Sequence, residues 1–332
     1  MRVLVTGAAG FIGFHLSRAL LAAGHHVTGL DAITPYYDVR LKHARLRELK
    51  HENFRMLTGD LNDPAAVAEA FFGEGPEIVA HLAAQAGVRY SLEAPLDYAD
   101  ANVRGTIAIL EAARKKPPRH LLVASSSSVY GMAGGVMRET QPTDQPVSLY
   151  AATKKATEAV THSYAHLFRL PVTCLRFFTV YGPWGRPDMA PFKFAEAIAA
   201  DRPIDIYGEG QMARDFTFVS DTVASVMALM AVVPGEGPAI DGDTLSPVGP
   251  WRVVNVAGGR PVPLMRFVEA FETSMKKPAR RNLLPMQPGD VVSTAADPAL
   301  LERLTGHVPQ VSVENGVAAF VQWFEGWRQT RP

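Results

Sequence analysis

Thr6-Gly7-Ala8-Ala9-Gly10-Phe11-Ile12-Gly13 is the stretch that decides the fold. It joins a short apolar run, Arg2–Thr6, to the segment Phe11–Ala23, whose apolar spacing predicts a helix. In such a turn, the first glycine permits a tight bend, the second lets a pyrophosphate approach the backbone, and the third lets the helix pack on the strand. The free N–H groups of the helix N-terminus attract that anion. The alternative is a glycine-rich turn without a ligand. We expect a dinucleotide to contact Gly7, Gly10, Phe11, Ile12 and Gly13.

Strand and helix patterns alternate from this turn to about residue 182. This order predicts a doubly wound, Rossmann-type α/β fold whose parallel sheet is covered on both faces. The pattern then loosens, which indicates a smaller mixed α/β C-terminal domain. We expect residues 1–182 to bind the dinucleotide, with returning segments near 214–230 and 253–257, and residues 183–332 to bind mainly the substrate. Further strands are predicted at 26–30, 54–57, 77–82, 119–125 and 171–178, helices at 64–72, 96–115, 149–168, 191–200 and 314–327, and a surface loop at 232–251.

The composition excludes several functional classes. The 332 residues include 33 Lys and Arg and 33 Asp and Glu, so the formal net charge is zero and nucleic acid is not an expected partner. No apolar run reaches the roughly 18 residues of a membrane span. The single cysteine, Cys174, cannot form an intramolecular disulfide, which fits a reducing compartment. With no signal-peptide pattern, we expect a soluble, cytoplasmic protein.

Residues at the ends of the next predicted strands suit a nicotinamide dinucleotide. Asp31 lies 18 residues after Gly13, where a carboxylate can bind the adenosine ribose hydroxyls. A carboxylate there would repel a 2′-phosphate, so the sequence favours NAD over NADP. Asp60 and Leu61 are expected near the adenine, with helix capping as the alternative for Asp60. The small residues after the fourth strand let the cofactor approach, and these are Leu82, Ala83 and Ala84.

A Ser/Tyr/Lys set indicates proton chemistry on a hydroxyl group. Tyr150 and Lys154 have the Tyr-x-x-x-Lys spacing, which places both side chains on one face of a helix. A tyrosine of ordinary pKa is a poor base at neutral pH, but a nearby ammonium and a positive nicotinamide ring favour its phenolate. The run Ser125–Ser128 ends the fifth strand, at the sheet edge where open α/β sheets bind ligands.

These motifs resemble the extended short-chain dehydrogenase/reductases, and among them the nucleotide-sugar 4-epimerases. The resemblance covers nearly the whole chain, and one departure is Ala32, where the resembled proteins usually have Asn. The segments that carry it are His81–Ser91, Ser125–Gly131, Ser148–Lys155, Leu175–Met189, Arg214–Thr217 and Leu284–Asp290.

The resemblance implies a catalytic set of Ser126, Tyr150 as the base and Lys154 as its partner. It implies that a UDP-sugar is oxidised at carbon 4 to a ketone by tightly held NAD and then reduced from the other face. Lys154 is expected also to bind the nicotinamide ribose, and Tyr150 is expected to contact the cofactor as well. We further expect Asn102 and Phe177 to line the cofactor pocket, with a purely structural role as the alternative for Asn102.

The leading hypothesis is that the sugar is glucuronate, with UDP-galacturonate as the product. The 4-ketone of glucuronate is a β-keto acid that can lose carbon dioxide, so its carboxylate must be held. Guanidinium binds carboxylate bidentately, which suits Arg186, although a surface arginine is the alternative. The resemblance adds Thr179 and Ser128 to this role, with Ser127 beside them. For the rest of the UDP-sugar we expect Arg214 at the diphosphate, Asp290 at the uridine ribose, and Arg89 and Lys193 in less defined roles, Lys193 with a structural alternative.

Other readings stay open. A UDP-glucose or UDP-N-acetylhexosamine 4-epimerase would need no carboxylate clamp. Related dehydratases carry an Asp-Glu pair at the positions of Ser127 and Ser128, and related decarboxylases tend to carry Glu at the second, so these serines argue against both reactions. A non-catalytic NAD-binding regulator is the alternative of a different class. The scattered histidines predict no metal site. In proteins of this resemblance the helices near 96–115 and 149–168 form a homodimer, which we expect here.

Overall fold

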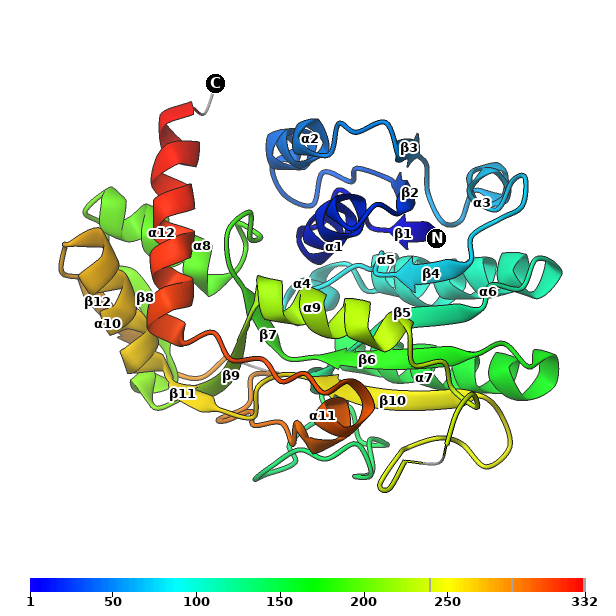
Figure 1. The fold of residues 1–332 in the computed structure, drawn as a ribbon. Coiled ribbons are helices and arrows are strands. Elements are labelled where there is room, and N and C mark those ends of the chain that lie inside the picture. The colour runs from blue at the N-terminus through cyan, green and yellow to red at the C-terminus, as the bar shows by residue number, and fades with distance from the viewer. Residues whose placement is uncertain (239, 288, 331–332) are drawn as a thin grey trace.

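A parallel sheet forms the centre of the computed structural model, which describes residues 1–238, 240–287 and 289–330 (Figure 1). Within the described residues this sheet has seven strands in the order β10-β6-β5-β4-β1-β2-β3, and every neighbouring pair is parallel. The strands are β1 (Arg2–Thr6), β2 (His26–Asp31), β3 (Phe54–Thr58), β4 (Ile78–His81), β5 (His120–Ser126), β6 (Val172–Phe177) and β10 (Trp251–Val256).

Alternate residues of each strand enter two separate cores. Val3 and Val5 of β1 belong to the core on one face, whereas Leu4 belongs to the core on the other. A strand places successive side chains on opposite faces, so a run of consecutive apolar residues needs helices on both sides of the sheet. The first core contains residues of α1 (Phe11–Ala22), α9 (Val219–Met230) and α11 (Ala299–Thr305), and the second contains residues of α3 (Pro64–Ala70), α6 (Gly105–Lys115) and α7 (Leu149–Phe168). The predicted fold class is confirmed.

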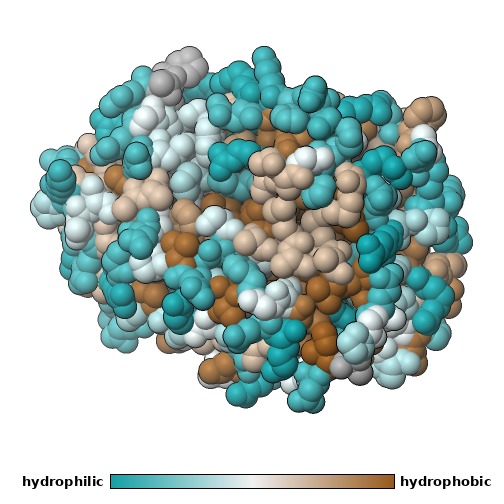
Figure 2. Space-filling model, in the orientation of Figure 1, coloured by the Kyte–Doolittle hydropathy of each residue, from teal (hydrophilic) through white to brown (hydrophobic). Residues whose placement is uncertain are grey.

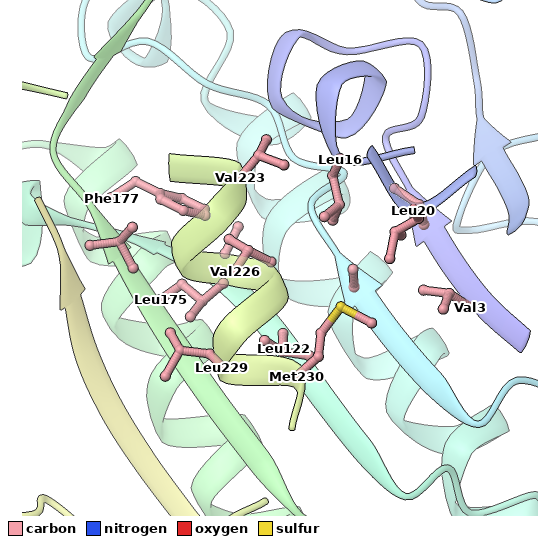
Figure 3. Close-up of a cluster of buried hydrophobic side chains, with 14 of the residues drawn as sticks. Val3, Leu16, Leu20, Leu122, Leu175, Phe177, Val223, Val226, Leu229 and Met230 are labelled. Atoms are coloured by element: carbon pink, nitrogen blue, oxygen red, sulfur yellow. The ribbon is translucent and has the colours of Figure 1, made fainter. Parts of the chain in front are cut away.

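Two late segments of the chain return to this first half. Strand β10 pairs with β6 at the edge of the sheet. Helix α9 packs on α1, and Figure 3 shows its Val226 and Leu229 among side chains of the sheet such as Leu122 and Leu175. Each fully buried side chain of this size contributes about 1.5–3 kcal/mol through the hydrophobic effect. Figure 2 shows the same side of the molecule, mostly hydrophilic, with hydrophobic colour concentrated near its centre. The proposed division into two interleaved domains stays a prediction.

The smaller C-terminal part has its own aromatic core. The rings of Phe216 and Phe267 are stacked with centroids 4.0 Å apart, and Phe192 and Phe320 pack beside them. It consists of α8 (Ala190–Ala199), α10 (Leu264–Met275), α12 (Val313–Thr330) and two small sheets, β11 (Pro261–Pro263) with β9 (Ala213–Phe218) and β7 (Thr179–Tyr181), and β12 (Arg281–Leu284) with β8 (Ile204–Tyr207).

One predicted helix is wrong in its form. The segment 96–115 is divided into α5 (Pro95–Tyr98), a π-helical stretch η1 (Ala99–Arg104) and α6, and a short helix α4 (Tyr90–Glu93) precedes it. The wide turn carries the buried Asn102 toward residues 85 and 153. A 3.6-residue apolar pattern does not reveal such a turn, because it is set by tertiary contacts. The helix α2 (Val39–Glu48) was not predicted, and no helix of the described residues could cross a membrane.

Candidate active site

The order of the strands reverses beside β1. Connections from β1 continue to β2 and β3 on one side, whereas β4, β5 and β6 lie on the other. Ligands of open α/β sheets bind at the carboxyl ends of the strands at such a point. Thr6 and His81 end the two strands that flank it, and the Thr6 hydroxyl lies 2.8 Å from the His81 ring and accepts the Ala83 N–H at 3.1 Å. Burial, with the charge of Lys154, lowers the pKa of His81 to about 3, so the ring is neutral.

The glycine turn leaves a cradle that only glycine backbone can form. Gly7 has φ +74°, and a Cβ there would stand 2.9 Å from the Ala83 nitrogen. A Cβ on Gly13 would stand 2.1 Å from the Gly7 oxygen. Helix α1 follows directly, and no side chain of the described residues caps it at Gly10. An uncapped helix N-terminus facing a glycine turn fits the pyrophosphate of a dinucleotide.

Asp31 is held by the backbone beside this turn. Its two carboxylate oxygens accept the N–H groups of Ala9 at 3.0 Å and Ile33 at 2.8 Å. Each oxygen retains a lone pair, which suits a ribose hydroxyl. Two buried cations of α2 lie near it and were not predicted. Lys42 donates to Thr34, and burial lowers its pKa while Asp31 opposes the shift. The fully buried Arg45 donates to Ala9 O, Tyr37 Oη and Trp184 O at 2.6–2.8 Å.

The other residues expected to bind the cofactor differ in their burial and in their hydrogen-bond partners. Asp60 does not cap a helix: its carboxylate accepts the Asn62 N–H at 2.7 Å, and Asp63 caps α3 instead. Asn102 is committed to the protein, because its amide binds both backbone groups of Gln85 and donates to Thr153. It therefore positions the loop after β4 against α7. Leu61 and Phe177 are buried, whereas Leu82, Ala83 and Ala84 are partly exposed beside the glycine turn. Their contacts with a cofactor stay predictions.

Ser126, Tyr150 and Lys154 come together where β5 ends and α7 begins. Ser148 caps α7 by accepting the Ala151 N–H at 3.1 Å, which sets Tyr150 in the first turn. Ser126 lies close enough to Tyr150 to lower the pKa of its phenol. The Lys154 ammonium donates to Ala124 O at 2.9 Å, so α7 is held against β5.

Burial shifts the pKa values of Tyr150 and Lys154, and neighbouring groups oppose both shifts. Burial raises the pKa of Tyr150, and the nearby Ser126 hydroxyl and the Arg186 charge oppose that shift. Burial lowers the pKa of Lys154 to about 8, and the Cys174 and Glu158 groups oppose that shift. A protonated Lys154 one helical turn away favours the phenolate.

A buried ion pair between α7 and β6 lies beside the trio, and the sequence did not predict it. Glu158, the next residue on this face of α7, binds Arg176 of β6 at 2.8 and 2.9 Å. Glu158 also accepts the Ser125 hydroxyl at 2.6 Å. Arg176 donates to Tyr130 Oη at 3.0 Å, and Tyr130 donates to Asn255 of β10. These bonds join β5, β6, β10 and α7 beside the predicted catalytic groups.

On the sugar side, the predicted serines lie in the turn η2 (Ser127–Tyr130) that follows β5. The Ser126 hydroxyl accepts the Ser128 N–H at 3.1 Å and shapes this turn. The Ser128 hydroxyl is buried, and none of the described residues gives it a hydrogen-bond partner. A buried polar group without a partner is costly, so it suits a bound ligand. Thr179 begins β7 and is half-buried.

Arg186 has a carboxylate partner within the chain. Its Nε donates to Asp188 Oδ1 at 3.0 Å, its Nη2 donates to Asp188 Oδ2, and Nη2 also contacts Ala86 O at 3.4 Å. Tyr36, from the loop after β2, donates to the same carboxylate at 3.2 Å. The Nε–Nη2 edge of Arg186 is thus already filled, which the sequence did not indicate.

The residues expected at the UDP end converge from distant parts of the chain. Arg89 and Asp290 form an ion pair at 3.2 Å, and the Arg89 guanidinium lies 4.3 Å from the Tyr207 ring centre. Burial lowers the pKa of Arg214 while Asp290 opposes the shift. Lys193 lies on the exposed face of α8. Pro288, in the motif before Asp290, lies outside the described residues. No three His, Cys, Asp or Glu groups that the structure describes are placed to hold a metal.

Comparison with known proteins agrees with this geometry. Residues 3–239 match the NAD dependent epimerase/dehydratase family. A probable UDP-glucuronate 4-epimerase of Rhizobium meliloti (strain 1021) is 54% identical over 331 residues, which span 98% of this chain and 97% of that protein. The structure of UDP-glucuronic acid 4-epimerase from Bacillus cereus, in complex with UDP-glucuronic acid and NAD, matches with a TM-score of 0.87 and 31% identity over 98% of this chain and 99% of that one. UDP-glucose 4-epimerase from Thermus thermophilus in complex with NAD gives 0.84 and 30% over 98% and 99%. This chain therefore belongs to the NAD dependent epimerase/dehydratase family.

Proposed function

We propose that the protein is an NAD-dependent isomerase that interconverts UDP-glucuronate and UDP-galacturonate by inverting carbon 4 of the sugar. The observation that carries the proposal is the Ser126–Tyr150–Lys154 trio, set where β5 ends and α7 begins, with the Arg186 charge acting on Tyr150. The relatives described above support the same substrate and cofactor.

The cofactor site fits NAD on this chain's own residues. The glycine cradle and the free N-terminus of α1 would hold the pyrophosphate, and Asp31 would accept the adenosine ribose hydroxyls. Lys154, already anchored to Ala124, would bind the nicotinamide ribose. When bound, NAD supplies the reversible uptake and return of a hydride at the sugar carbon, which no side chain can provide.

The side chains move the proton and hold the sugar. Tyr150 accepts the proton of the hydroxyl on carbon 4 and later returns it, while the Lys154 charge stabilises the phenolate. Ser126, which lies beside Tyr150 and lowers its pKa, shares the proton of the same sugar hydroxyl. Ser128, Thr179 and Arg186 hold the carboxylate so that it is not lost as carbon dioxide. Arg214, Arg89 and Asp290 bind the UDP portion.

A product assay tests this function. Purified protein with NAD is incubated separately with UDP-glucuronate, UDP-galacturonate, UDP-glucose and UDP-N-acetylglucosamine, and the products are separated by chromatography. We expect the two uronates to interconvert and no UDP-pentose to form. Conversion of only the neutral sugars would support the 4-epimerase alternative, UDP-pentose alone would indicate a decarboxylase, and no conversion of any sugar would leave a non-catalytic NAD-binding protein.

We also propose that the protein is a homodimer in the cytoplasm. Apolar side chains stay exposed on and beside α6 and α7, including Leu96 (75%), Leu167 (62%) and Phe168 (38%). Exposed apolar side chains along these helices support an interface between two copies. Light scattering should give a mass near twice 36.0 kDa, and a monomer mass would reject the dimer. The lone buried Cys174 fits a reducing compartment, and cell fractionation tests the location.

A further inference from the structure

Arg186, the residue predicted to bind the sugar carboxylate, is itself held by hydrogen bonds within the chain. Asp188 takes its Nε and Nη2 side-on, and Ala86 O takes a further bond from Nη2. None of the described residues accepts a hydrogen bond from the third nitrogen, Nη1. The side chains of Arg186 and Asp188 are only 19% and 29% exposed, so the pair lies inside the site rather than on the surface. Only one nitrogen of this guanidinium is left for a ligand.

A second element fixes the Asp188 carboxylate. The Tyr36 hydroxyl donates to Asp188 at 3.2 Å, and the Tyr36 ring lies 5.8 Å from the Arg186 guanidinium. The same ring packs on Tyr90 of α4 with centroids 4.9 Å apart. Gly87 lies against this group, because a Cβ there would stand 2.9 Å from the Tyr36 oxygen. Three segments, after β2, after β4 and after β7, thus meet at one ion pair.

Arg186 also lies close to the reacting groups. Its charge acts on Tyr150, and the Tyr98 ring packs edge-to-face against Tyr150 with centroids 6.0 Å apart. The Tyr98 hydroxyl donates to Ala86 O at 3.2 Å and to Gly87 O, so the backbone that contacts Arg186 is tied to the ring beside the base. A small rotation of Arg186 would change where its free nitrogen meets a sugar.

We propose that Asp188 and Tyr36 are a positioning pair that presents the Nη1 nitrogen of Arg186 to the sugar carboxylate and so determines the preference for an acidic sugar. This inference rests on the proposed function. It differs from a simple clamp, because the substrate carboxylate is bound end-on at Nη1 while Asp188 keeps the opposite edge. Neither residue touches the substrate.

The role has a chemical readout that a structural role lacks. In a 4-keto uronate whose carboxylate is poorly held, the bond between carbons 5 and 6 can break. Its electron pair then forms the enolate between carbons 4 and 5, carbon dioxide leaves, and carbon 5 takes a proton. The hydride removed earlier from carbon 4 then returns to the ketone and gives a UDP-pentose. A displaced Arg186 should therefore raise KM for UDP-glucuronate and also divert turnover toward this UDP-pentose.

The test compares Asp188→Asn and Tyr36→Phe with the wild type and with Glu236→Gln, which removes a carboxylate from the exposed Arg119 pair far from the site. We expect Asp188→Asn to lower kcat/KM for UDP-glucuronate about tenfold, mainly through KM, as expected for a lost charge-assisted hydrogen bond. Its pentose fraction should rise, and Tyr36→Phe should change both quantities in the same direction by a smaller factor. The inhibition constant of UDP, which lacks the sugar, should stay within about twofold, and Glu236→Gln should match the wild type.

Several results would overturn the inference while the proposed function stands. An unchanged kcat/KM and product ratio in both variants would show that Arg186 needs no positioning. A lower KM in Asp188→Asn would show that Asp188 competes with the substrate instead. Equal weakening of UDP binding would indicate a general collapse of the site, and Tyr36→Phe, which removes only a hydroxyl, decides the case if Asp188→Asn unfolds. If the wild type converts neither uronate, the proposed function itself fails.

Discussion

The residues predicted to bind the cofactor and those predicted to bind the sugar, here called the cofactor half and the sugar half, are held in place by different kinds of partner. In the cofactor half, polar side chains are aimed by backbone groups of neighbouring strands: Asp31 by two N–H groups and Lys154 by Ala124 O. In the sugar half, charged side chains are aimed by each other, as in Arg89–Asp290 and Arg186–Asp188. Backbone bonds form with the fold itself, whereas a partly exposed ion pair such as Arg89–Asp290 contributes little to stability. Changes in the first half should therefore affect folding and cofactor, and changes in the second should affect the choice of substrate.

The largest effect is expected at the point where the halves meet. Tyr150→Phe should lower kcat with UDP-glucuronate by about a thousandfold, since general acid–base catalysis contributes roughly 10²–10⁴-fold. NAD content and UDP binding should change little, because the glycine turn, Asp31 and Lys154 still hold NAD. Product assays and the absorbance of bound cofactor measure these quantities. Turnover within tenfold of the wild type would refute Tyr150 as the base.

Removal of a charged side chain from the sugar half should weaken the reaction of an acidic sugar more than the binding of a neutral one. Arg186→Ala should lower kcat/KM for UDP-glucuronate by roughly 30- to 150-fold, the value of a charged hydrogen bond of about 2–3 kcal/mol. Inhibition by UDP-glucose should hardly change, because a neutral sugar has no carboxylate to hold. Steady-state kinetics with both nucleotide sugars measure the contrast. Equal losses for both sugars would contradict the separation of the two halves.

A substitution in the glycine turn of the cofactor half should lower the stability of the fold as well as NAD binding. Gly13→Ala forces a Cβ against the Gly7 oxygen and should cost about 1–3 kcal/mol of unfolding free energy, together with NAD binding. Gly134→Ala is the matched control, because a Cβ there meets nothing within 4 Å. Chemical denaturation and NAD titration report both effects. A Gly13→Ala protein as stable as the control would show that the turn can relax.

The pH dependence should report Lys154. Its pKa is lowered by burial to about 8, so the ammonium is charged below that pH and is lost as the pH rises through it. Because the charge stabilises the Tyr150 phenolate, kcat/KM should fall on the alkaline side of about pH 8. The Lys154→Arg variant keeps the positive charge, although it should turn over more slowly. Its kcat/KM should not fall up to about pH 10, because that pH is well below the pKa of a guanidinium. A limb at the same pH in both proteins would assign it to another group.

The smallest effect is expected at the exposed end of the sugar half. Arg89→Ala should weaken UDP binding only a few-fold and change the unfolding free energy by less than about 1 kcal/mol, since its pair with Asp290 is partly exposed. Calorimetric titration with UDP at two salt concentrations measures the first quantity. Destabilisation above about 2 kcal/mol would show that this pair supports the fold.

The same contrast explains what could be predicted from the sequence. The glycine turn, Asp31 and the Tyr150–Lys154 spacing act over short stretches of chain, so the strands of the central sheet, the fold class and helix α7 could be predicted. One ion pair of the sugar half is not local, because Arg89 and Asp290 are 201 residues apart. The π-helical turn at Asn102, the contact of Tyr36 with Asp188 and the Glu158–Arg176 pair also depend on tertiary contacts. The loosely patterned C-terminal elements, such as β8 and β12, were missed for the same reason.

A crystal structure with NAD and UDP-glucuronate tests the central claim most directly. The quantity to measure is the distance from the Tyr150 Oη atom to the oxygen on carbon 4 of the sugar. The proposed chemistry predicts a hydrogen-bond distance of about 2.6–3.2 Å, with the carboxylate at Arg186 Nη1. A phenolic oxygen more than about 5 Å from that hydroxyl, beyond hydrogen-bond reach and with another side chain in its place, would contradict it.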